Sequence, residues 1–150
     1  MSFLIAIGGA RGSGKSTIAR HLGTTLRADI IHLGRIRSVL RSVPGHDPVL
    51  DLSVNKQEKL GGSMEILERQ AELLRKAVDR VISECEERRA ALVIEGTHCL
   101  PGLYSVADVH VILEVSNATL RARYGKDKWR GGTADSQSQS LTKAITRNYQ

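Results

Sequence analysis

Residues 9–17 decide the fold, and they read Gly9-Ala10-Arg11-Gly12-Ser13-Gly14-Lys15-Ser16-Thr17. The first eight fit the phosphate-loop pattern G-x-x-x-x-G-K-[ST] without a mismatch. An apolar run of strand length, residues 3–7, precedes the loop, and Ile18, Leu22 and Leu26 follow it at the four-residue spacing of a helix. Strand, glycine loop and helix in this order are the context that the pattern requires. We therefore predict a phosphate-binding loop rather than a chance glycine turn.

The residue types of the loop explain how it would hold a nucleotide. Glycines let the backbone turn its N–H groups inward as an anion-binding nest, and a helix opening at Lys15 adds its positive N-terminal end. We assign all of residues 9–17 to ATP binding. Lys15 is expected to place its ammonium group between the outer phosphates, and the Ser16 hydroxyl to ligate Mg²⁺.

Length and composition predict a single soluble domain, residues 1–150. No apolar run approaches the roughly 18 residues of a membrane span. Cys85 and Cys99 have no metal-ligand spacing and are expected to be reduced, as in a cytoplasm. The net charge of +6 favours anionic partners. Aromatic residues make up only 3%, which favours nucleotides and phosphorylated metabolites over nucleic acid. The oligomeric state is left open.

Four apolar runs predict a parallel sheet. They are residues 3–7, 29–32, 91–94 and 108–115, and the second is expected to end in a turn near Gly34. A long amphipathic helix, from Ser63 to Arg88 and Arg89, carries one apolar stripe and is expected to serve packing. The right-handed crossover rule then predicts a three-layer α/β fold with strand order 2-3-1-4 and helices on both faces.

Several polar residues follow the predicted strands, where open α/β sheets bind their ligands. Glu95 ends the third strand, and we expect it to contact Mg²⁺ through water or to act as a base. Arg37 and Arg41 lie on a short helix after the second strand. They are candidate contacts to the acceptor, the molecule that would receive a phosphoryl group, and the alternative is a solvated basic face of the helix. His98 is equally consistent with an acceptor contact and with a hydrogen-bonded loop histidine.

Two connections are predicted to cover the site. Residues 43–62 form a long irregular segment, expected on the acceptor side with one short helical turn. Residues 121–140 are a candidate lid, and Arg121, Arg123 and Arg130 are its candidate catalytic cations. The alternative for these residues is an exposed basic loop. A last helix is expected over residues 141–150.

Three segments together resemble the 2-phosphoglycerate kinase family. They are the glycine loop, Ile36-Arg37-Ser38-Val39-Leu40-Arg41, and Val93-Ile94-Glu95-Gly96-Thr97-His98-Cys99-Leu100-Pro101-Gly102. The third matches the family's distinctive I-E-G-x-H-x-x-P-G stretch, and Gln70 and residues 145–147 are also similar. The resemblance implies a P-loop small-molecule kinase that uses ATP and Mg²⁺ and phosphorylates a hydroxy acid that already carries a phosphate.

The chain departs from that family at one turn and in its length. An S-T-D-S-type turn usually precedes the I-R-x-V-L-R segment, whereas this chain has His32-Leu33-Gly34-Arg35, so the family's Asp falls on Gly34. Either Glu95 takes the role of that Asp, or the acceptor differs, or transfer is slow. Family chains also continue further. Two alternatives therefore stay open: a polynucleotide or nucleoside kinase, and a nucleotide-binding regulatory protein without transfer activity.

Overall fold

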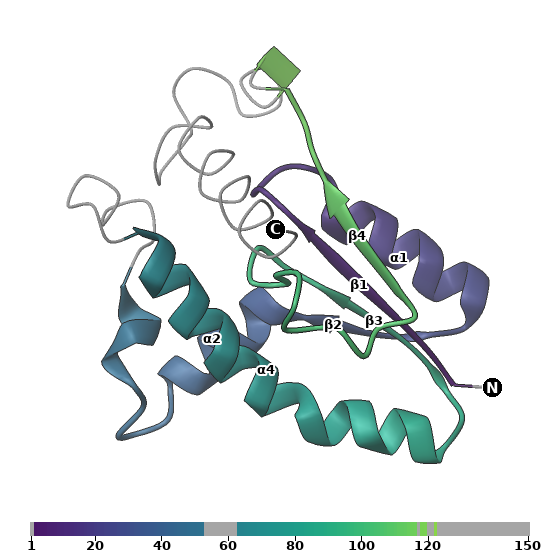
Figure 1. Ribbon diagram of the computed structural model, residues 1–150, viewed down its shortest axis with the longest axis horizontal. Helices are drawn as coiled ribbons and strands as arrows, with labels where there is room; N and C mark the ends of the chain where they lie inside the picture. The colour runs from purple at the N-terminus through teal and green to yellow at the C-terminus, as the bar shows by residue number, and fades with distance from the viewer. Residues whose placement is uncertain (1, 53–62, 117, 120–121, 123–150) are drawn as a thin grey trace.

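A four-stranded parallel sheet forms the centre of the computed structural model, which describes residues 2–52, 63–116, 118–119 and 122 (Figure 1). Its order is β2-β3-β1-β4. The strands are β1 (Phe3–Gly9), β2 (Asp29–His32), β3 (Ala91–Glu95) and β4 (Val109–Leu113). All three neighbouring pairs are parallel. The predicted fold class and strand order are confirmed.

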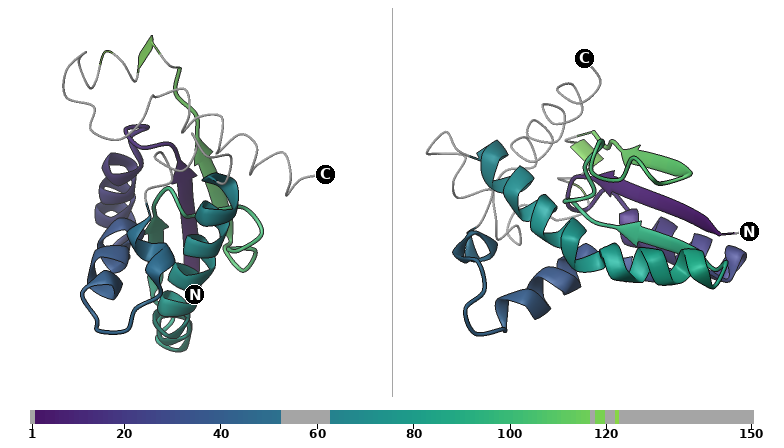
Figure 2. Two further views of the ribbon diagram at one scale, coloured as in Figure 1. Left: turned by 90° about the vertical axis from the view of Figure 1, so that its left-hand side faces the viewer. Right: turned by 60° about the horizontal axis from the view of Figure 1, so that its bottom comes forward.

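The helices cover both faces of this sheet. They are α1 (Lys15–Leu26), α2 (Leu33–Arg41), the 3-10 turn η1 (Pro48–Asp51) and α4 (Ser63–Glu87). Alternate residues of β1 point to opposite layers: Ile5 and Ile7 pack in one core cluster with Ala19 of α1. Leu4 and Ala6 pack in another cluster with the apolar stripe of α4. Figure 2 shows α1 and α4 on opposite sides of the strands, which confirms the three layers.

Some element boundaries differ from the sequence prediction. The turn expected at Gly34 is wrong, because α2 begins at Leu33 directly after β2 and includes Gly34 in its first turn. Two strands extend beyond their predicted ends, β1 to Gly9 and β3 to Glu95, whereas β4 is shorter than predicted. The helical turn expected within residues 43–62 is η1. Cys85 and Cys99 are both buried free thiols, as predicted.

Candidate nucleotide and acceptor site

The loop between β1 and α1 has the backbone that its glycines predict. Gly9, Gly12 and Gly14 adopt φ angles of 140°, 82° and 103°, which L side chains rarely adopt. Helix α1 then begins at Lys15. Residues 11–18 and Thr97 line an open cleft of about 650 Å³ beside the start of the helix. A cleft at a helix N-terminus suits a phosphate group.

Lys15 is buried within this loop, with 7% of its surface exposed. Its Nζ donates a hydrogen bond to the carbonyl oxygen of Ala10 at 2.6 Å. Burial lowers the pKa of Lys15 from 10.5 to about 8, although the nearby Glu95 carboxylate acts in the opposite direction. The hydroxyl of Ser13 is also buried and has no hydrogen-bond partner among the described residues. An anion in the cleft would give the Ser13 hydroxyl a partner and the Lys15 ammonium a second one.

Glu95 joins the loop to the end of the neighbouring strand. Its Oε1 accepts a hydrogen bond from Ser16 Oγ at 2.9 Å and contacts His32 Nδ1 at 2.6 Å. The sheet register explains this arrangement, because Glu95 pairs with His32 of β2. Sequence reasoning missed His32, although the predicted strand order places the ends of the second and third strands side by side.

The donor chemistry of Ser16 and Glu95 fits Mg²⁺. A hydroxyl and a carboxylate are the hard oxygen ligands that this ion takes, with water and phosphate oxygens completing its shell. No three His, Cys, Asp or Glu side chains gather as a metal cluster in the described parts of the chain, so an all-protein cage is not formed there. Ser16 would hold the cation directly, and Glu95 would hold it directly or through water.

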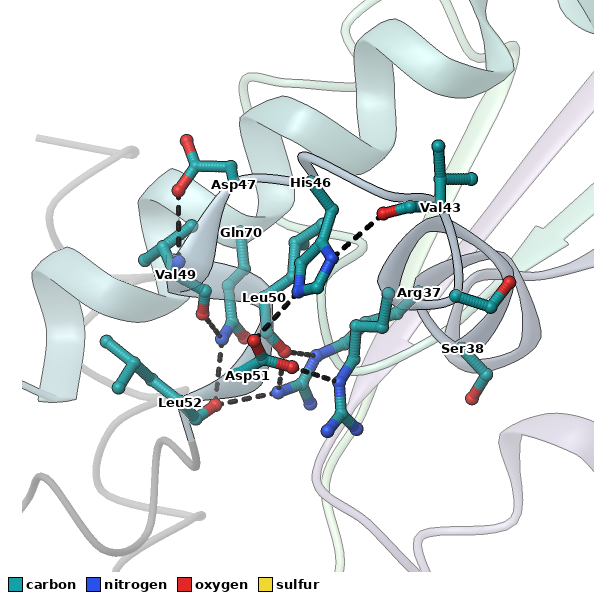
Figure 3. Close-up of polar contacts among 12 residues, drawn as sticks. Arg37, Ser38, Val43, His46, Asp47, Val49, Leu50, Asp51, Leu52 and Gln70 are labelled. Atoms are coloured by element: carbon teal, nitrogen blue, oxygen red, sulfur yellow. Dashed lines mark hydrogen bonds and ion pairs between the residues drawn. The ribbon is translucent and has the colours of Figure 1, made fainter.

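On the acceptor side, Arg37 holds the backbone of η1. Its Nε and Nη2 donate to the carbonyl oxygen of Leu50 at 2.9 and 2.6 Å, and Nη2 also donates to Leu52 at 2.7 Å (Figure 3). Arg41 pairs with Asp51 through Nε at 2.8 Å. The two arginines thus connect α2 to the described part of the 43–62 segment.

Gln70 and His98 complete this network from the other side. Gln70 is fully buried on α4, and its Nε2 donates to the carbonyl oxygens of Val49 and Leu52 at 2.6 and 2.9 Å. Its Oε1 lies 2.9 Å from His98 Nε2, which must therefore carry the hydrogen. Burial, with the charges of Arg37 and Lys15, lowers the pKa of His98 to about 3, so its ring is neutral.

The structure therefore gives a partner within the protein to each predicted acceptor contact, namely Arg37, Arg41 and His98. Their contact with an acceptor stays a prediction. Arg121, Arg123 and Arg130 of the predicted lid lie outside the described residues, as does the helix predicted over residues 141–150. None of the described helices is long and apolar enough to cross a membrane. The cytoplasmic location stays a prediction.

Comparisons with known proteins agree with this architecture. The sequence profile of the AAA-domain family matches residues 5–142. The chain is 32% identical over 109 residues to a 2-phosphoglycerate kinase of Methanocaldococcus jannaschii, an alignment that covers 67% of this chain. It covers only 35% of that relative, so the chain spans about a third of the relative's length.

Two solved kinases share the fold at low sequence identity. Shikimate kinase from Acinetobacter baumannii superposes with a TM-score of 0.56 and 14% identity, covering 97% of this chain and 75% of that one. Deoxyadenosine kinase from M. mycoides with bound dATP superposes with a TM-score of 0.53 and 16% identity, covering 98% of this chain and 83% of the other. The chain thus belongs to the AAA-domain family and has the fold of P-loop kinases.

Proposed function

We propose that the chain is an ATP-dependent phosphotransferase whose acceptor is a small phosphorylated metabolite similar to 2-phosphoglycerate. One observation carries the proposal: a buried lysine and a serine line one cleft at a helix N-terminus, and the serine hydroxyl donates a hydrogen bond to a strand-end carboxylate. These three groups suit a nucleoside triphosphate with a divalent cation. The similarity to a 2-phosphoglycerate kinase supports the acceptor class.

Each residue near the cleft then has a specific part in transfer. Lys15 and the loop N–H groups bind the phosphates, while Ser16 and Glu95 hold Mg²⁺, which neutralises charge on the phosphate oxygens when it is bound. The acceptor hydroxyl oxygen bonds to the γ-phosphorus as the bond to the bridging oxygen of ADP breaks. The hydroxyl proton goes to a base, and Glu95 is the candidate for it, as an alternative to its metal contact.

On the acceptor side, Arg37 is the candidate to bind the acceptor's own anionic group. Its Nε and Nη2 are occupied by the carbonyl oxygens of Leu50 and Leu52, and Nη1 takes part in none of these hydrogen bonds. A guanidinium group fixed on one edge and open on the other suits a phosphate or a carboxylate. Arg41 and His98 stay candidates nearby, and Arg121, Arg123 and Arg130 are candidates for a lid.

The test is transfer of ³²P from labelled ATP with Mg²⁺ to 2-phosphoglycerate, beside other phosphorylated acids, nucleosides and oligonucleotides. Labelling of 2-phosphoglycerate should fall about 10²-fold or more in Lys15→Ala, the usual effect of losing one electrostatic stabiliser. Lys76→Ala, which changes an exposed lysine of α4, is the matched control and should leave turnover unchanged. Labelling of another acceptor would keep the kinase and reject the substrate. ATP binding with no labelling would favour the regulatory protein instead.

A further inference from the structure

His32 lies closer to the carboxylate of Glu95 than Ser16 does. Its Nδ1 lies 2.6 Å from Glu95 Oε1, and Ser16 Oγ donates to the same oxygen at 2.9 Å. The carboxylate oxygen accepts, so Nδ1 carries the hydrogen. Both of these contacts are made to Oε1, and neither is made to Oε2. One oxygen of the carboxylate is thus held by two donors, while the other is open.

The positions of His32 and Glu95 are both set by the pairing of strands β2 and β3. His32 is the last residue of β2 and is directly opposite Glu95 in the β2–β3 register, and α2 begins at the next residue. The side chain of His32 is 24% exposed and that of Glu95 only 8%, so the imidazole ring partly covers the carboxylate. A donor at a strand end needs no loop movement to keep this contact.

Two donors on one oxygen restrict the rotation of a carboxylate, whereas one donor leaves it free to turn. Ser16 alone would be a weak restraint, because its hydroxyl rotates and its oxygen is also the candidate metal ligand. The imidazole of His32 is planar and is attached to a rigid strand, so it sets the orientation in which Oε2 stays open. Groups that orient a metal ligand in this way have large effects on metal affinity.

We propose that His32 is a positioning residue for Glu95: its Nδ1–H fixes the carboxylate so that the Ser16 hydroxyl and Glu95 Oε2 remain set for a divalent cation beside the nucleotide phosphates. This inference rests on the proposed function for its cation and nucleotide. It does not depend on the identity of the acceptor or on transfer to any acceptor.

The experiment measures binding of Mn²⁺ to the full chain in complex with ADP, by electron paramagnetic resonance of free Mn²⁺. His32→Leu removes the donor at similar size and should weaken Mn²⁺ binding about tenfold or more. His32→Asn keeps an amide donor near the Nδ1 position and should stay within about threefold of the parent protein, by the same reasoning. His21→Leu changes an exposed histidine of α1 and is the matched control, with no expected effect. Affinity for ADP without metal should be unchanged in all three.

Three results with the His32 variants would overturn the inference. The first is Mn²⁺ affinity in His32→Leu that matches the parent protein. The second is an equal loss in His32→Leu and His32→Asn, because packing of the ring would then matter and not the donor. The third is an equal loss of metal-free ADP affinity, which would mean a distorted loop. If His32→Leu does not fold, His32→Ala replaces it under the same criteria.

This experiment, taken together with the ³²P transfer assay, separates this inference from the proposed function. A parent protein that binds Mn²⁺ and ADP but labels no acceptor would contradict the phosphotransferase while the His32 variants still test the positioning role. A parent protein that labels an acceptor, with His32→Leu binding Mn²⁺ normally, would contradict the positioning role alone. A parent protein that binds no Mn²⁺ with ADP would overturn the positioning role as well.

Discussion

Replacing Lys15 by methionine should stabilise the protein near neutral pH, and this effect should fade in alkaline solution. Burial lowers the pKa of Lys15 to about 8 from the 10.5 that the unfolded chain would keep. Below pH 8 both states carry the proton, and the difference between the two pKa values means that burying the charge costs roughly 3 kcal/mol. Between about pH 8 and 10.5 the folded state loses its proton first. The cost therefore declines as the pH rises, and wild-type stability increases relative to a variant without the charge.

The assay is urea unfolding of wild type and Lys15→Met without nucleotide, from pH 7 to 10.5. The variant loses the hydrogen bond to Ala10, about 1 kcal/mol that opposes its gain at every pH, so the pH dependence of the difference is the readout. Groups that the charge of Lys15 does not affect titrate equally in both proteins and cancel, and His98, whose pKa that charge lowers, stays neutral over this pH range. Lys76→Met, an exposed control, should show a flat difference. If the difference in free energy of unfolding between wild type and Lys15→Met stays constant up to pH 10.5, the inference that Lys15 is buried as an ammonium ion is refuted.

Substitutions at four further positions test packing and hydrogen bonds in the fold. Gly8→Ala would put a methyl carbon 2.4 Å from a backbone carbonyl oxygen and should lower the free energy of unfolding by about 1–3 kcal/mol. Gly34→Ala places its methyl group in open space on α2 and should raise the free energy of unfolding by up to about 1 kcal/mol. If urea unfolding ranks Gly8→Ala as more stable than Gly34→Ala, the packing described for these two glycines is contradicted. Gln70→Leu leaves buried polar groups unpaired and should cost about 2–4 kcal/mol, with faster proteolysis near η1; unchanged cleavage would argue against its anchoring role. Asp108→Ala should speed hydrogen exchange at the Leu4 amide, which donates to that carboxylate at 2.7 Å, whereas Asp108→Asn should preserve its protection.

The order of the strands could be predicted from sequence because each cue is local or general. Apolar runs mark the strands, the glycine loop marks the first crossover, and the handedness rule orders the sheet. The boundary of α2 could not be predicted in this way. Gly34 permits a turn, but a glycine also fits a helix, and the packing of Leu33 in the core decides between them.

The residues of the candidate site could be predicted from the sequence only where a motif assigns one role to a residue. Lys15 and Ser16 follow from the motif. In the structure they donate to Ala10 and Glu95, and their contacts with phosphate and Mg²⁺ stay predictions. Arg37 shows the limit, because a guanidinium group is satisfied equally by a ligand anion and by backbone carbonyl oxygens, and only the folded chain shows the second. His32 depends on strand register, which couples residues 63 positions apart. The role of Gln70 could have been inferred from the sequence, because it is a polar residue within the apolar stripe of α4.

The anchoring of η1 has a consequence for the order of folding. Its carbonyl oxygens are paired with Arg37 and Gln70 at sequence separations of 13 to 21 residues, and Gln70 meets His98 a further 28 residues along. The hydrogen bonds of Arg37 and Gln70 form only once α2 and α4 have come together around η1, and the contact of Gln70 with His98 also needs the chain beyond β3. The loop-closure entropy is therefore lost before the network is complete. We expect substitutions here to accelerate unfolding while leaving the refolding rate nearly unchanged. The acceptor side would then be the last part of the molecule to assemble and the first to open.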